Sequence, residues 1–248
     1  MKNRLMIATL FSTLTLASGF SQAETLKVAS TPTGSPFTFL DTKSNSIQGV
    51  MVDIVSAVGE QAGFDVQIEP MQFSALIGSL TSRRVDLISA AMFITDERKQ
   101  VVDFSIPVYS YGEGVVVPSK DTTEYTELAQ LKGKRVGVQV GTAFVTPLQS
   151  SGLFSDVKLY DTTADMLRDA NAGRIDVAVL DYPIAAYAIA QDNFPNLRLV
   201  TSYEPTMVNS IGIAARKDDP QLMARINTAL EKLQADGSID AIIGKWGL

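Results

Sequence analysis

The chain has 248 residues, the size of one large domain or two small ones. Hydrophobic residues make up 46% of it and charged residues 19%, which excludes a disordered or fibrous protein. Because Cys and His are absent, zinc, copper and haem sites that use these ligands are excluded, as are Ser-His-Asp and Cys-His nucleophiles. We therefore expect no cofactor and no metal site.

The N-terminus has the order of a secretory signal. Lys2 and Arg4 precede an apolar stretch, diluted by Ser and Thr, that ends in small residues before Glu24. This stretch is shorter than the ~20 residues that a membrane span needs. We predict a signal peptide over residues 1–23, cleaved after Ala23, and a periplasmic mature protein; the alternative is a buried N-terminal helix.

The charge of the mature chain limits its partners. Removal of residues 1–23 takes away Lys2 and Arg4 and no acidic residue, which changes the formal net charge from −6 to −8. An acidic chain without a basic run is a poor candidate for binding nucleic acid or anionic lipid. We expect a small-molecule ligand, no nucleic acid and a monomeric protein.

Short β-branched runs alternate with helical periodicity along the first unit. Strands are predicted at residues 26–29, 66–69 and 86–91. One helix carries its apolar residues on one face and ends at Gly63, and two others begin at the caps Ser74 and Thr95, the latter running over residues 96–102. The face of the first helix consists of Met51, Ile54, Val55, Val58 and Ala62.

The same alternation restarts in a second unit and returns in the tail. Strands are predicted at residues 114–118, 135–140, 157–160, 176–180 and 210–215. Helices are predicted at 127–131, after a cap at Thr163, at 183–191, and from the cap Asp219 to Gly237. Strand-helix-strand repetition predicts an α/β fold with mostly parallel sheets.

Nucleotide motifs are incomplete. Gly112-Glu113-Gly114 resembles the start of a dinucleotide loop, but Val117 stands where the third Gly belongs and no helix follows. No P-loop is present either. The sequence therefore gives little support to nucleotide binding.

Two segments are candidates for binding an anion. Arg98 lies one turn into a predicted helix, and its guanidinium can hold a carboxylate through two parallel hydrogen bonds. The alternative is an exposed Arg in the charged run 96–99. Gly141-Thr142-Ala143 follows the strand 135–140, where α/β proteins place ligands; the alternative is a plain turn.

An acid and an aromatic residue each allow a ligand-binding and a structural interpretation. Asp181 ends the strand 176–180, so its carboxylate either pairs with an ammonium group or caps the next helix, and spacing leaves both open. Phe73 either stacks on a ligand or packs in the core. None of these residues decides a function by itself.

The segments together carry a resemblance to a known family. The matching stretches are residues 73–80, 94–99, 102–107, 133–139 with Gly141-Thr142, 173–176 with Asp181, and 226–246. In this order they resemble the family 3 solute-binding proteins, which are the periplasmic polar-amino-acid-binding proteins of ABC importers. The resemblance covers essentially the whole mature chain.

The resemblance implies a two-lobed periplasmic-binding-protein type II fold, with two mixed sheets, flanking helices and a two-crossover hinge. The implied lobes are residues 24–112 plus 203–248 and residues 113–202, with hinges near 112–117 and 201–209. The ligand, a polar amino acid or an amino-acid derivative, would lie in the interlobe cleft. Closure would then present a surface to the ABC permease.

The resemblance also implies roles for individual residues. Arg98 looks like the residue that binds the ligand carboxylate, helped by Thr142 and the amide of Ala143. Asp181 looks like the acid that pairs with the α-ammonium group. Phe73 looks like the aromatic residue that packs on the ligand side chain. The resemblance also implies that the backbone of Ala91 completes the pocket.

Some positions depart from the family pattern. Gly34 stands where many relatives have an aromatic residue, Phe93 stands where a hydroxyl often helps to bind the amino-acid head, and Ala143 replaces a common Thr. These departures suggest a bulkier or more apolar ligand, such as an N-alkylated amino acid. Thr31 lies near the position where binders of basic amino acids carry an acid, which argues against Lys or Arg as ligand.

The alternative function is enzymatic. Some relatives of this fold are exported cyclohexadienyl dehydratases that act on prephenate or arogenate. Asp181 or Glu113 in the cleft would then have to act as the general acid, and Phe73 and Phe93 would form a pocket for the ring. Fold alone does not distinguish these functions.

Overall fold

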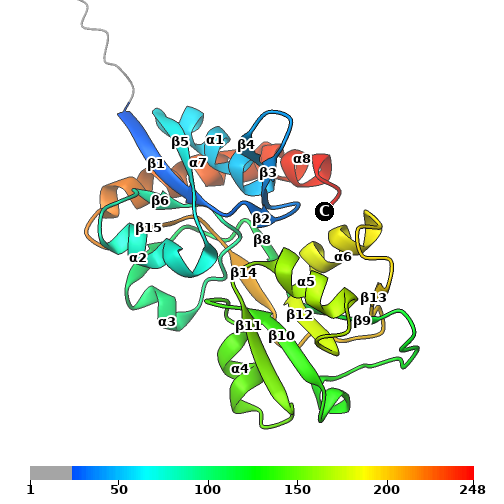
Figure 1. Ribbon diagram of the computed structural model, residues 1–248. Helices are drawn as coiled ribbons and strands as arrows, with labels where there is room; N and C mark the ends of the chain where they lie inside the picture. Colours follow the sequence, from blue (N-terminus) through cyan, green and yellow to red (C-terminus); the bar gives the residue numbers. More distant parts are fainter. Residues whose placement is uncertain (1–23) are drawn as a thin grey trace, which may run out of the picture.

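Two five-stranded mixed sheets organise the chain into two lobes (Figure 1). The computed structural model describes residues 24–248, so the predicted signal peptide lies outside the described residues. The α/β class and the two-lobed arrangement expected from the sequence are confirmed. Among the helices of residues 24–248, none is long and apolar enough to cross a bilayer.

The sheet of the first lobe takes strands from both ends of the chain. Its order is β5, β1, β6, β15, β7. Strand β1 runs parallel to β5 and β6, whereas β15 runs antiparallel to β6 and β7. The bounds are β1 (Glu24–Ser30), β5 (Phe64–Pro70), β6 (Leu87–Ile88), β7 (Val102–Phe104) and β15 (Ala214–Arg216).

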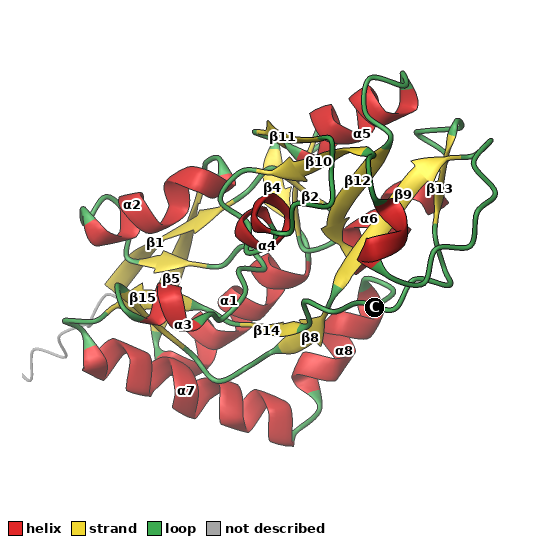
Figure 2. Cartoon of the chain, turned by 90° about the horizontal axis from the view of Figure 1, so that it is seen from below, coloured by secondary structure: helices red, strands yellow, loops and turns green. Residues whose placement is uncertain are grey.

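Helices cover this sheet, and α1 packs against α7 and α8. Figure 2 shows α7 along the outer side of the lobe. The predicted face of α1 is buried except for Ala62, which is half-buried, and the helix ends as predicted at Gly63, whose φ is 78°. The bounds are α1 (Val50–Ala62), the 3-10 helix η1 (Phe73–Ala75), α2 (Leu76–Thr81), α3 (Asp96–Lys99), α7 (Pro220–Ala235) and α8 (Ser238–Lys245).

The second lobe has the sheet order β11, β10, β12, β9, β13. Strand β10 is parallel to β11 and β12, and β9 is antiparallel to β12 and β13. The strands are β9 (Glu113–Pro118), β10 (Arg135–Gln139), β11 (Asp156–Tyr160), β12 (Val177–Asp181) and β13 (Leu197–Leu199). The helices are η2 (Leu128–Leu131), α4 (Val145–Ser150), α5 (Thr163–Asn171) and α6 (Tyr182–Ala190).

A two-stranded antiparallel ladder lies between the two sheets (Figure 2). It pairs β8 (Tyr109–Tyr111) with β14 (Asn209–Ile211). The single strand predicted over residues 210–215 is therefore two strands, because the chain passes from this ladder into β15 of the first lobe. A small sheet of β2 (Thr33–Gly34), β3 (Thr38–Asp41) and β4 (Ser46–Gln48) completes the fold.

One carboxylate joins the two crossovers between the lobes. Glu113 is fully buried and accepts hydrogen bonds from the Tyr203 hydroxyl at 2.7 Å and the Thr206 hydroxyl at 3.1 Å. It also accepts from the main-chain N–H groups of Thr206 and Met207, both at 2.8 Å. The crossovers are thereby held together, while the exact lobe boundaries near residues 112 and 203 stay a prediction.

Two of the four predicted helix caps are confirmed. The side chains of Thr95 and Asp219 accept hydrogen bonds from the first turns of α3 and α7. Ser74 is not a cap, because it lies inside η1, which precedes α2. Thr163 is not a cap either: Thr162 caps α5, and Thr163 is the first residue of the helix.

Candidate functional site

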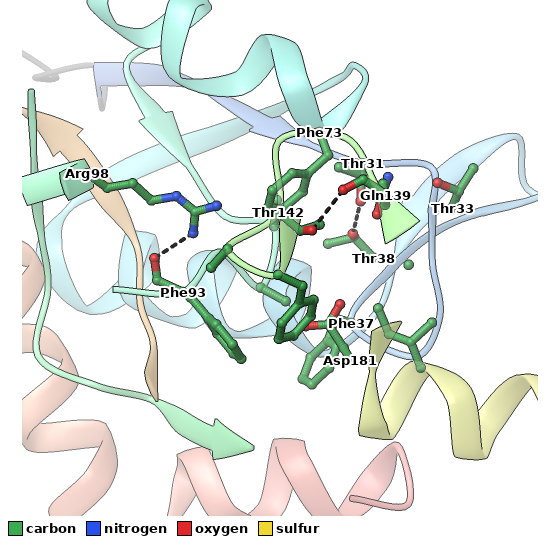
Figure 3. A pocket seen from close by; sticks show the side chains of 16 residues that line it. Thr31, Thr33, Phe37, Thr38, Phe73, Phe93, Arg98, Gln139, Thr142 and Asp181 are labelled. Atoms are coloured by element: carbon green, nitrogen blue, oxygen red, sulfur yellow. Dashed lines mark hydrogen bonds between the residues drawn. The ribbon is translucent and has the colours of Figure 1, made fainter. Parts of the chain in front are cut away.

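A pocket of about 440 Å³, including space open to solvent, lies between the lobes (Figure 3). Every site residue chosen from the sequence lines it: Gly34, Phe73, Ala91, Phe93, Arg98, Thr142, Ala143 and Asp181. The first five come from the first lobe and the last three from the second. The structure brings these residues together, and their roles toward a ligand stay predictions.

Arg98 is held in place from both sides of the cleft. Its main-chain N–H donates to the cap Thr95, which fixes it in the first turn of α3. Its Nη1 donates to the carbonyl of Phe93 at 2.7 Å, and its Nη2 donates to the carbonyl of Gly141 at 2.9 Å. The guanidinium also lies 5.7 Å from the centre of the Phe73 ring.

The charge of Arg98 has no carboxylate at hydrogen-bonding distance among residues 24–248, because both of its acceptors are neutral carbonyls. A guanidinium has five N–H donors, so three remain for another acceptor. The residue is only 8% exposed, so the alternative of a surface Arg is wrong. Burial lowers the pKa of Arg98, but a guanidinium stays charged at neutral pH.

Asp181 is the acidic counterpart of Arg98 in the pocket. It ends β12 and occupies the position before α6, but its side chain makes no capping hydrogen bond. Burial raises the pKa of this carboxyl group to about 6, although the nearby Tyr111 hydroxyl and the Arg98 guanidinium lower it. The carboxylate therefore lacks the local support that a structural cap has.

The loop after β10 brings the second lobe against the first. Gly141 has φ of 80°, and a Cβ there would lie 3.0 Å from Cα of Ser74 in the first lobe, so this position requires Gly. The Thr142 hydroxyl donates to the carbonyl of Gln139 at 2.8 Å. Its proton is thus used within the loop, whereas the Ala143 amide donates to no described residue. The amide is the better anion donor of the two.

Aromatic rings form one wall of the pocket. The Phe93 ring lies 4.9 Å from Tyr111 and meets Phe144 of the second lobe edge to face at 5.5 Å. The Phe37 ring stacks on Tyr111 at 5.2 Å. Phe93 thus acts through its carbonyl on Arg98 and through its ring on this wall. The expectation that it favours a bulkier ligand stays a prediction.

Several lining residues were not chosen from the sequence as site residues. They are Thr31, Thr33, Phe37, Thr38, Ala90, Gln139, Phe144 and Ile184. Gln139 ends β10 in the same way that Asp181 ends β12, so the rule that places ligands at the carboxyl ends of parallel strands would have found it. The hydroxyl group of Thr38 gave no such signal.

Glu113 does not lie where the enzymatic alternative requires it. It is absent from the residues that line the pocket, and its carboxylate oxygens accept four hydrogen bonds from the second crossover. Of the two proposed general acids, Asp181 alone faces the pocket. The placement of Glu113 in the cleft was therefore wrong.

A sequence model described as bacterial extracellular solute-binding proteins, family 3, matches residues 26–248. The chain belongs to this family. The extracellular location in the family's description agrees with the export expected from the sequence. The two-lobed arrangement is the periplasmic-binding-protein type II fold expected from the sequence.

Members of the family with assigned ligands are similar to this chain over most of their length. The putative ABC transporter arginine-binding protein 2 of Escherichia coli (strain K12) is 32% identical over 98% of both chains. The L-cystine-binding protein TcyJ of the same organism is 29% identical over 90% of this chain and 82% of its own. Both relatives are binding proteins, and their names give different ligands.

A solved structure described as an ancestral arginine-binding protein bound to glutamine superposes with a TM-score of 0.83. It shares 33% sequence identity, and the match covers 91% of this chain and 99% of that one. The names of the two relatives and the description of this structure give different ligands. The ligand must therefore be argued from the pocket.

Proposed function

We propose that the interlobe pocket binds an α-amino acid as its zwitterion and that the protein delivers it to an ABC permease. The observation that carries this proposal is the pair of opposite charges in one pocket. Arg98 offers free donors to the carboxylate, and Asp181 offers an acceptor to the ammonium group. The named relatives, which are amino-acid-binding proteins, support the same ligand class.

The pocket is suited to a zwitterion because its own charges balance. A buried charge costs less when an opposite charge and hydrogen bonds accompany it. A ligand with one negative and one positive end supplies a partner to each of Arg98 and Asp181. The Ala143 amide adds a donor beside the carboxylate position.

The same pair links ligand binding to closure of the lobes. Arg98 belongs to the first lobe and Asp181 to the second, so the two ends of one small ligand contact different lobes. A ligand favours the closed state only to the extent that it binds this state better than the open one. Contacts to both residues exist together only when the cleft is closed. Closure then distinguishes the loaded protein for the permease.

Isothermal titration calorimetry with a panel of amino acids tests this proposal. Arg98→Ala is expected to weaken binding of the tightest ligand by roughly 10- to 100-fold, because a buried anion loses its charged partner. Arg174→Ala is the matched control, because Arg174 is an exposed Arg paired with Asp169 outside the pocket. Equal affinities of both variants, or no binding of any amino acid to the parent protein, would refute the site.

We also propose that the protein is not an enzyme. The dehydratase alternative needs a general acid in the pocket, and Glu113 does not line it because its carboxylate binds the second crossover. Asp181 is the remaining candidate, and in the binding proposal it pairs with the ammonium group of the ligand. Incubation with prephenate and arogenate, followed by detection of the aromatic product, tests this point. Product formation that depends on Asp181 would overturn it.

A further inference from the structure

Uncharged polar side chains gather at the end of the pocket away from Arg98. In Figure 3, Thr31, Thr33, Thr38 and Gln139 lie on the side opposite the guanidinium, beyond Phe73 and Thr142. All four line the pocket. Within residues 24–248, its ionisable lining side chains are Arg98 and Asp181. This end therefore contacts a ligand through hydrogen bonds without a charge of its own.

The amide of Gln139 is fixed in one orientation. Its Nε2 donates to the carbonyl of Asp161 at 3.0 Å, and the residue is 7% exposed. The opposite orientation would set Oε1 against that carbonyl oxygen, which is repulsive. Oε1 receives no hydrogen bond from another described residue, so it remains as an acceptor for the pocket. An acceptor left unpaired in a buried site favours a ligand that brings a donor.

The hydroxyl groups of Thr31 and Thr38 supply the complementary donor. Their oxygen atoms are 2.7 Å apart, and both residues are buried. One hydroxyl donates to the other, so one proton of the pair remains free to donate elsewhere. The end of the pocket thus presents a fixed acceptor and a spare donor.

Charge decides which side chains fit this end. The carboxylate and ammonium groups of an amino acid neutralise Arg98 and Asp181, so a guanidinium or ammonium side chain would add a buried charge without a partner. A fully apolar side chain would leave Gln139 and the threonine pair unpaired. A side chain that donates and accepts without a net charge avoids both costs.

We propose that this end of the pocket selects an α-amino acid whose side chain ends in a carboxamide or ureide group, with Gln139 as a specificity-determining residue. The inference rests on the proposed function, because Arg98 and Asp181 must hold the amino-acid head. It narrows the expectation of a bulky ligand to one with a polar, uncharged end. The aromatic wall of Phe37 and Phe93 contacts the apolar part of such a side chain.

Calorimetric titration of the mature protein with five amino acids tests the inference. L-glutamine and L-citrulline carry the required group, whereas L-arginine, L-glutamate and L-methionine are cationic, anionic and apolar comparisons of related length. The tighter of the first two is expected to bind at least ~10-fold more tightly than each of the other three. If arginine, glutamate or methionine binds equally well, the inference is overturned and the proposed function stands. If no amino acid binds, both fail.

The variant Gln139→Leu tests the residue itself. It removes the acceptor at similar side-chain volume, so the preference for the carboxamide or ureide ligand over methionine is expected to fall roughly 10-fold. A purely structural role of Gln139 would weaken both ligands equally and leave the ratio unchanged, which would contradict the assignment. The double variant Thr31→Val, Thr38→Val removes both hydroxyl groups, and with them the spare donor, while Gln139 stays in place, and it serves if the first variant does not fold. An unchanged ratio there also overturns the inference.

Discussion

Glu113 and Asp181 lie opposite each other where β9 pairs with β12, but their carboxylates have different surroundings. Glu113 accepts four hydrogen bonds from the second crossover. Asp181 does not cap α6, and burial raises its pKa to about 6. A buried acid whose oxygens the protein satisfies supports the structure, whereas one without that support is available to a ligand.

The largest expected effect comes from breaking the satisfied acid. Glu113→Gln replaces one acceptor oxygen by an NH₂ group that faces N–H and O–H donors, so at least one buried donor loses its partner. The free energy of unfolding is expected to fall by about 3 kcal/mol, measured by urea denaturation. The exposed substitution Glu60→Gln is the control. Equal midpoints of the two variants would mean that the hydrogen bonds of Glu113 contribute little.

Replacement of Asp181 is expected to change the free energy of unfolding in the opposite direction, because the effect of burial on this acid outweighs the support from Tyr111 and Arg98. The pKa of Asp181 in the folded protein, about 6, lies above its ordinary value of 3.8, so the native state binds this proton more tightly than the unfolded state. Stability is therefore lost as pH rises from about 4 to 6 and stays lower above that range. Asp181→Asn is expected to raise the free energy of unfolding of the ligand-free protein at pH 8 by about 2 kcal/mol.

Urea denaturation at two pH values measures this gain. At pH 4 the carboxyl group is protonated in the native parent protein, so the stability difference between parent and variant is expected to disappear. Affinity for the amino acid is expected to fall in the same variant, because the ammonium group of the ligand loses its anionic partner. If Asp181→Asn is less stable than the parent protein at pH 8, the interactions of the ionised carboxylate outweigh the cost of its burial.

The pH dependence of binding tests whether ionised Asp181 pairs with the ligand. Protonation of Asp181 below pH 6 removes the partner of the ligand ammonium group, so affinity is expected to fall by up to about tenfold per pH unit there. Calorimetry at pH 5 and pH 7.5 measures this change. In Asp181→Asn the slope between these values should be absent. A slope that persists in the variant would assign the titration to another group.

The smallest expected effect concerns two neighbouring threonines, one with a structural hydrogen bond and one with a hydrogen bond across the cleft. Thr162 accepts a hydrogen bond from Asp165 within its own helix, whereas the Thr163 hydroxyl donates across the cleft to the carbonyl of Thr33 at 2.6 Å. Thr163→Val is expected to weaken ligand binding by about 1 kcal/mol, mainly through faster dissociation, because the closed state loses a contact.

Stopped-flow kinetics measures the dissociation rate of this variant. Thr163→Ser keeps the hydroxyl group and should retain the parental rate. Thr162→Val should instead lower stability by about 1 kcal/mol with unchanged affinity, because it removes a helix cap. Unchanged dissociation in Thr163→Val would show that the bond to Thr33 does not help to hold the lobes closed.

The sequence was sufficient to predict features that depend on nearby residues. The apolar face of α1, its end at Gly63 and the cap Thr95 follow from spacing within a few residues, and they are confirmed. The position of Arg98 after that cap is also local. The cap of α5 was misplaced by one residue, because Thr162 and Thr163 are chemically identical and only backbone geometry separates them.

Features that depend on distant residues were beyond the sequence. Glu113 was placed in the cleft because nothing near it in the chain shows that residues 203–207 surround its carboxylate. Whether Asp181 caps α6 also required the three-dimensional structure. The acceptor of Gln139 depends on Asp161, which comes from a separate strand connection. Partners that are far apart in sequence decided which polar groups remain free.

The position of β15 inside the first sheet has a consequence for the order in which the chain assembles. This strand, residues 214–216, lies between β6 and β7, so the sheet of the lobe that contains Arg98 is incomplete until nearly the whole polypeptide has been delivered. The strands of the second sheet all lie within residues 113–199, one continuous stretch. During vectorial secretion the second lobe can therefore fold first, and the first lobe waits for its last strand.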